Sequence, residues 1–137
     1  MTLSWSQNYS VDINTIDEQH KKFFSIFNKA DELIAEPKSD VRSQKINEIF
    51  LGLDDYAKFH FAYEESYFEK FAYSRKDEHI AEHKKFIHDL EDLQSRFKSG
   101  EEDIVFNIIS FLEGWLVSHI SYSDKLYSEC FRKNGVE

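Results

Sequence analysis

The chain has few of the residues that interrupt helices or form covalent cross-links. Among 137 residues there are one proline, four glycines and one cysteine, Cys130. A turn-rich β fold uses Gly and Pro far more often, so this composition favours long uninterrupted helices. A single cysteine excludes an intrachain disulfide and a zinc site built on cysteine ligands.

Basic residues are also scarce. The chain has 17 Lys and Arg against 26 Asp and Glu, which gives a formal net charge of −9. With no basic stripe to offset this charge, we expect neither nucleic acid nor an anionic membrane as a partner. The N-terminal residues lack the basic and apolar regions of a signal peptide. No apolar run approaches the roughly 18 residues of a membrane helix. We therefore expect a cytoplasmic protein.

Apolar residues are plentiful enough to build a core. Hydrophobic residues make up 41% of the chain and aromatic residues 16%, and the length predicts one domain, residues 1–137. Apolar residues recur three and four positions apart in four stretches, which predicts helices at about 16–35, 40–72, 75–98 and 101–127. The short connections favour an all-α, up-down-up-down antiparallel four-helix bundle. Residues 1–14, with Trp5 and Tyr9 as anchors, predict an extended arm across that bundle.

The helix starts carry recognisable capping signals. Thr15 followed by Glu18 matches a capping box for the first helix. Ser39 or Asp40 can cap the second helix, and Ser74 can cap the third.

Two histidine pairs at helical spacing suggest a metal site. His60 precedes Glu64, and His79 precedes His83, by four residues each, so each pair stacks on one helix face. Imidazole and carboxylate together suit iron, zinc or manganese. His119 and Asp124 are five residues apart, which an α-helix would rotate by roughly 140°. A π-type bulge, or a loosened turn, across residues 120–123 would bring the two side chains together, and we predict one of these two distortions.

In an up-down bundle, the first and third helices begin at the same end of the bundle at which the second and fourth helices finish. Seven candidate ligands then lie at similar depth from that end: His20, His60, Glu64, His79, His83, His119 and Asp124. A single such pair is more often an ordinary surface pair. Burying all seven without partners would cost up to several kcal/mol each, which favours metal ligation. His88 lies nine residues from His79, roughly 180° around the helix, and should face solvent.

These residues resemble those of the single-domain bacterial hemerythrins. The resemblance covers nearly the whole chain and includes Trp5, Ile16 to His20, His60-Phe61-x-x-Glu64-Glu65, Tyr73, His79-x-x-x-His83 and His119-Ile120-x-x-x-Asp124. Two departures stand out. Phe68 replaces a common Met and Ser74 replaces a common Pro, and we expect neither to touch a ligand.

The resemblance implies two non-haem iron ions, bridged by an oxo or hydroxo oxygen and by the carboxylates of Glu64 and Asp124. By the same resemblance, His79, His83 and His119 would hold a six-coordinate iron. His20 and His60 would hold the other iron, which keeps one position open for dioxygen.

The expected function is reversible dioxygen binding for storage, delivery or sensing, rather than enzymatic turnover. The alternative is a di-iron enzyme acting on peroxide, nitric oxide or ferrous iron. A ferritin-like enzyme is rejected because no Glu-x-x-His motif occurs. A third class of function is a sensing module whose surface is recognised by a protein partner. The sequence does not identify such a partner.

Four aromatic residues are expected to surround the open iron position with apolar surface. Their spacing from His20 and His119 places them beside those ligands: Phe23, Phe27, Phe111 and Trp115. An ordinary core role is compatible with this one. A dry wall would admit neutral O2 and slow the entry of water and protons.

Overall fold

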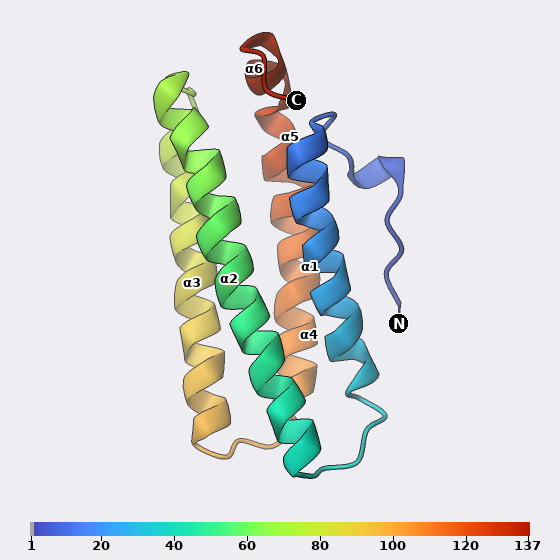
Figure 1. The fold of residues 1–137 in the computed structure, drawn as a ribbon. Helices are drawn as coiled ribbons and strands as arrows, with labels where there is room; N and C mark the ends of the chain where they lie inside the picture. Colours follow the sequence, from blue (N-terminus) through green and yellow to red (C-terminus); the bar gives the residue numbers. More distant parts are fainter. Residues whose placement is uncertain (1) are drawn as a thin grey trace.

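The computed structural model describes residues 2–137, and over these residues it contains helices and no strand. Four long helices run alternately up and down with short connections, which confirms the predicted bundle (Figure 1). Their bounds are α1 Asn14–Glu32, α2 Asp40–Lys70, α3 Lys76–Lys98 and α4 Ile104–Trp115.

The fourth helix does not continue as a regular α-helix. It passes into a π-helical segment, η2 (Leu116–Ser123), and then into the short helix α5 (Asp124–Leu126). The predicted π bulge is confirmed, although it begins four residues earlier than residue 120. The wider turn matters because it brings His119 and Asp124 onto one face.

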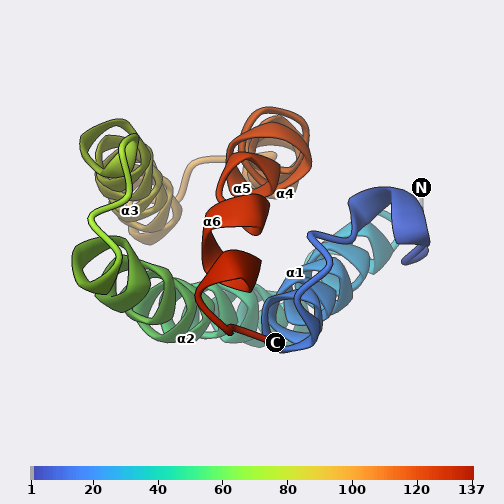
Figure 2. The same cartoon turned by 90° about the horizontal axis from the view of Figure 1, so that it is seen from above.

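A further helix, α6 (Ser128–Lys133), was not anticipated from the sequence. Seen from above, it lies over the space between the long helices (Figure 2). Phe131 is fully buried there and stacks on Tyr127, with ring centroids 4.3 Å apart. This helix therefore closes the end of the bundle at which α1 begins.

The predicted N-terminal arm is present, but it runs alongside α1 rather than across the bundle (Figure 1). It contains one 3-10 turn, η1 (Gln7–Tyr9). The side chain of Asn28 accepts from the Leu3 amide at 2.7 Å and donates to its carbonyl at 2.9 Å. The ring of Trp5 packs edge-on against Phe24.

The predicted capping box at the start of α1 is wrong. The helix begins at Asn14, and the hydroxyl of Thr15 accepts a hydrogen bond from Tyr63 instead. The nearby Asp17 ties down the arm by accepting from the Val11 amide at 2.9 Å and from the Ser10 hydroxyl at 2.6 Å.

Of the other two predicted helix caps, one is confirmed and one is wrong. Ser39 caps α2 by accepting from the Arg42 amide at 3.1 Å, as predicted. Ser74 does not cap α3, because Arg75 takes the N-cap position and makes no side-chain capping hydrogen bond.

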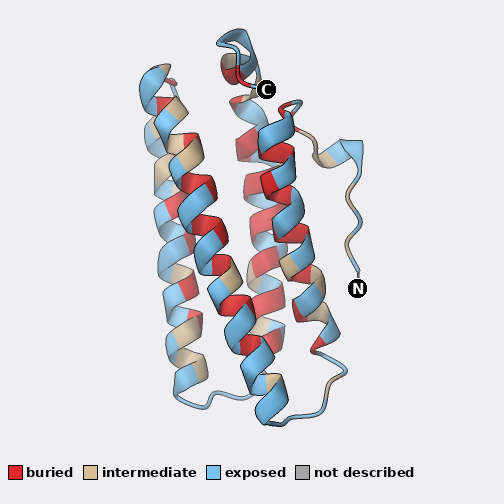
Figure 3. Ribbon diagram, viewed as in Figure 1, coloured by how far each residue is buried: buried red, intermediate tan, exposed pale blue. Residues whose placement is uncertain are grey.

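The interior has two apolar clusters, and buried residues face inward along all four helices (Figure 3). The main cluster fills most of the bundle and includes Phe23, Leu53, Phe86 and Leu112. The end cluster lies under α6 and consists of Val11, Ile13, Ile16, Phe68, Tyr73, Tyr127, Phe131 and Val136. Rings of both clusters contact the candidate ligands, so the polar site lies between two apolar layers.

The last helical stretch corrects one expectation. By length and composition, Ile104–Lys133 could cross a membrane, whereas the sequence was expected to contain no such stretch. Because 44% of its most apolar window is buried inside the bundle, the same composition also suits the core helix of a bundle.

Candidate metal centre

The seven predicted ligands meet at one point of the bundle, beneath α6. α1 supplies one, α2 two, α3 two, η2 one and α5 one: His20, His60, Glu64, His79, His83, His119 and Asp124. Their exposed fractions lie between 0% and 3%. The predicted convergence is thus confirmed, and the exposed His88 lies outside it, as expected.

The ligand atoms divide into two groups of mutually close atoms. Glu64 joins three imidazoles, those of His79, His83 and His119. Asp124 joins two, those of His20 and His60. Within each group, all the ligand atoms lie within 4.8 Å of one another.

The carboxylate of Asp124 faces both groups. Its Oδ2 lies 2.8 Å from His20 Nε2, and its Oδ1 lies 2.9 Å from His119 Nε2 and 3.0 Å from His79 Nε2. One oxygen is therefore directed at each group, which is the placement a carboxylate bridging two ions requires.

Glu64 also reaches both groups, here through a single oxygen. Its Oε1 lies 3.0 Å from His83 Nε2 and 3.2 Å from His60 Nε2.

The buried ligand atoms that lack a hydrogen-bond partner test whether the site fits a metal. The buried Nε2 atoms of all five imidazoles and all four carboxylate oxygens lack a hydrogen-bond partner that meets ordinary geometry. Leaving so many buried polar atoms unpaired would be costly. Imidazole nitrogen with carboxylate oxygen is a ligand set suited to iron, so the residues fit the metal.

Residues outside the ligand set contact the Nδ1 atoms of three imidazole rings and hold these rings in place. We call these contacts the outer contacts. Gln19 Oε1 lies 2.5 Å from His60 Nδ1, Glu65 Oε2 lies 2.7 Å from His83 Nδ1 and Glu82 Oε1 lies 2.9 Å from His119 Nδ1. A ring that donates from Nδ1 keeps the lone pair of Nε2 free for a metal. Each contact also ties one helix to its neighbour along the chain.

The protonation of the metal-free site follows from its charges. Burial alone would raise the pKa of Asp124, but His119 and the neighbouring imidazoles hold it well below its usual value. Burial alone would lower the pKa of His79, yet the carboxylates of Asp124 and Glu64 raise it to about 10. Without a metal, the cluster therefore retains protons that a cation would have to displace.

Aromatic rings cover the imidazoles. On the side of the main cluster, Phe61 stacks on His83 with centroids 3.8 Å apart, and Tyr56 stacks on His60 at 5.1 Å. On the side of the end cluster, Phe68 lies 4.7 Å from His79. Contrary to expectation, the departure at Phe68 therefore touches a candidate ligand.

The four predicted wall residues take different positions. Trp115 stacks directly on His119, with centroids 3.7 Å apart. Phe23 lies behind Tyr56, and the half-buried Phe111 lies behind Phe86. Phe27 is fully buried in the main cluster. Their role toward a bound ligand stays a prediction.

Several residues that contact the candidate ligands were not predicted from the sequence. Tyr56 and Phe61 sit on the helical stripe of α2, but spacing alone does not separate a ring over a ligand from a core ring. Glu65 and Glu82 each directly neighbour a ligand in the sequence, and this adjacency is the signal that could have found them.

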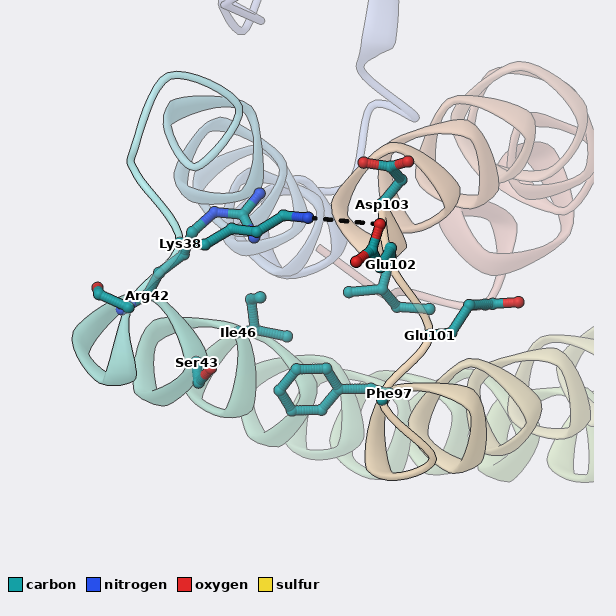
Figure 4. Close-up of a pocket in the computed structure, with 11 residues that line it drawn as sticks. Lys38, Arg42, Ser43, Ile46, Phe97, Glu101, Glu102 and Asp103 are labelled. Atoms are coloured by element: carbon teal, nitrogen blue, oxygen red, sulfur yellow. Dashed lines mark hydrogen bonds and ion pairs between the residues drawn. The ribbon is translucent and has the colours of Figure 1, made fainter.

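The opposite end of the bundle has a different character. A surface hollow of about 370 Å³ lies there, with Lys38 and Glu102 paired across it at 3.8 Å (Figure 4). None of the imidazoles lines it. The chemistry of the buried cluster is thus confined to the end beneath α6.

Fold and site together define a class of protein: a four-helix bundle with a buried histidine–carboxylate cluster able to hold metal ions. The family model of the hemerythrin HHE cation binding domain matches residues 11–130. The chain belongs to the hemerythrin family.

Similar proteins agree with this assignment. A bacteriohemerythrin of Methylococcus capsulatus is 31% identical over 93% of this chain and 95% of its own length. A bacteriohemerythrin of Clostridium acetobutylicum is 31% identical over 90% of this chain and 96% of its own. A crystal structure of wild-type hemerythrin superposes with a TM-score of 0.81 at 30% identity, covering 95% of this chain and 98% of that one.

Proposed function

We propose that the chain binds dioxygen reversibly at a pair of iron ions, and that it serves O2 storage, delivery or sensing rather than catalysis. The observation that carries the proposal is the unequal division of five imidazoles into three and two, with Asp124 directed at both groups. The relatives that share this fold are named bacteriohemerythrins.

The division supports one saturated and one unsaturated metal position. His79, His83 and His119 would hold one iron, and His20 and His60 the other, with Glu64 and Asp124 shared between them. The second position has one protein ligand fewer than the first. A metal position with a ligand missing can accept a small molecule, as catalytic metal sites do.

The charge of the ligand set favours reversible binding. Five imidazoles add no negative charge when neutral, and only two carboxylates enter the set. A site rich in carboxylates would favour higher oxidation states of iron, whereas this one supports the ferrous pair. When bound, the iron pair supplies the redox chemistry of reversible dioxygen uptake that side chains lack.

The protein's own contribution is to exclude water and protons. The ligands are 0–3% exposed and lie between two apolar clusters. Tyr56 and Trp115 cover His60 and His119 from the side of the main cluster. A dry pocket would slow the entry of the water and protons that irreversible oxidation of a loaded iron pair needs.

A visible spectrum followed through cycles of air and argon tests this function. The ferrous protein should gain a charge-transfer colour in air and lose it under argon. Turnover of peroxide or nitric oxide at a useful rate, with no reversible colour change, would instead favour the di-iron enzyme.

A further inference from the structure

The outer contacts behind the two groups of imidazoles differ in charge. Behind the group of three, His83 is held by Glu65 and His119 by Glu82, at 2.7 and 2.9 Å. The hydroxyl of Ser123 donates to Glu82 at 2.7 Å and fixes its carboxylate. Two anionic groups therefore support this side of the site.

Behind the group of two, no carboxylate contacts an Nδ1 atom. His60 is held by the neutral amide of Gln19 at 2.5 Å. The Nδ1 atom of His20 is buried and has no hydrogen-bond partner in the structure. This side is therefore neutral in its outer contacts and less firmly held.

A carboxylate that accepts from Nδ1–H makes the imidazole a stronger donor and fixes its orientation toward the metal. The carboxylates of Glu65 and Glu82 are 36% and 38% exposed, so solvent screens their charge in part. Their hydrogen bonds remain direct, which places the expected effect at the low end of the usual range for such contacts.

We infer that Glu65 and Glu82 are positioning residues that make the three-imidazole group hold its metal more tightly than the two-imidazole group. The two metals then leave the protein one after the other, and the metal held by His20 and His60 leaves first. This inference rests on the loading of two metals in the proposed function, but not on dioxygen binding.

The number of ligands could by itself produce the same order, because three imidazoles bind more tightly than two. The outer carboxylates must therefore be tested separately from the ligands. Glu82→Gln and Glu65→Gln keep the size and the accepting oxygen while removing the charge. Gln19→Glu adds a charge behind His60. Glu91→Gln, at an exposed position of α3, is the matched control.

The experiment is chelator challenge of the purified, metal-loaded full-length protein, with metal release followed over time. The wild type should release its metal in two phases of equal amplitude. Glu82→Gln and Glu65→Gln should each speed the slow phase about tenfold and leave the fast phase unchanged. Gln19→Glu should slow the fast phase by a similar factor, and Glu91→Gln should change neither.

The inference is overturned if Glu82→Gln and Glu65→Gln behave like Glu91→Gln, or if they speed both phases equally. Circular dichroism of each loaded variant checks that the bundle is intact. A protein that releases metal in the predicted order but fails to bind dioxygen reversibly would contradict only the proposed function.

Discussion

The indole of Trp115 lies flat against the imidazole of His119, with ring centroids 3.7 Å apart and ring planes 11° from parallel. This contact joins the main apolar cluster directly to a candidate ligand. It also closes the site on the side of α4, where Phe111 and Phe86 continue the aromatic packing toward the surface.

Replacing Trp115 with Ala should speed the irreversible oxidation of the ferrous protein several-fold while changing its iron content much less. The physical reason is that water and protons reach the site once the indole is gone. Loss of the visible colour over hours in air measures the rate, and metal analysis measures the content.

The milder Trp115→Phe retains a ring over His119 and should oxidise more slowly than Trp115→Ala. Trp5→Ala removes the other tryptophan, which packs on Phe24 at the arm, and serves as the control. Equal oxidation rates in the two alanine variants would contradict the role of Trp115.

Replacing His79 and His88 in turn should distinguish a metal ligand from an ordinary histidine of the same helix. We expect His79→Ala to lose metal and colour, because its Nε2 lies in the group of three imidazoles. His88→Ala should keep both, because His88 is exposed on the other face of α3. If His88→Ala bleached the protein and His79→Ala did not, the ligand assignment would fail.

Metal removal should destabilise the bundle. Without a metal, the five Nε2 atoms and the carboxylate oxygens of Glu64 and Asp124 are buried and lack a hydrogen-bond partner that meets ordinary geometry. We expect the melting temperature to fall by about 10 °C or more, corresponding to roughly 3 kcal/mol or more for a domain of this size. Calorimetry of the loaded and chelator-treated protein measures the difference, and coincident melts would refute a structural contribution of the metal.

Metal uptake should depend on pH with a definite sign. In the metal-free protein, Asp124 and Glu64 raise the pKa of His79 to about 10, so this imidazole carries a proton at neutral pH. A metal requires the neutral ring, so each binding event releases a proton. The apparent affinity should therefore rise with pH, by up to about tenfold per unit for each displaced proton, until the pH approaches that pKa.

Competition with a chelator of known affinity, repeated between about pH 6 and about pH 8, measures this dependence. An affinity that stays constant, or that falls with pH after correction for the chelator, would show that no proton is displaced.

The bundle and the convergence of its ligands could be predicted from the sequence because both follow from periodicity. Spacings of three and four fix which face of a helix is buried, and short connections fix the antiparallel order. The five-residue step from His119 to Asp124 predicted a π-type bulge or a loosened turn, since a regular helix would separate these two residues, and the structure has the π segment.

What could not be predicted depends on distances between elements. Thr15 has the sequence of a helix cap but bonds to Tyr63 on α2. Phe68 touches His79 across the end of the bundle. Spacing along one helix carries no information about such contacts.

The two groups of ligand atoms predict how many metal ions the chain holds. We expect two irons per chain in fully loaded protein, because seven ligands in two clusters exceed what one ion takes. Elemental analysis that returns a single metal per chain at saturation would rule out the pair.

The central claim is that dioxygen binds and leaves intact, and the most direct test is a quantitative uptake measurement. Ferrous protein in a closed oxygen-electrode cell should take up one dioxygen per two irons and return the same amount on exchange into argon, over repeated cycles. Uptake without return, accompanied by ferric iron and free peroxide on first exposure to air, would contradict the account and identify an oxidase.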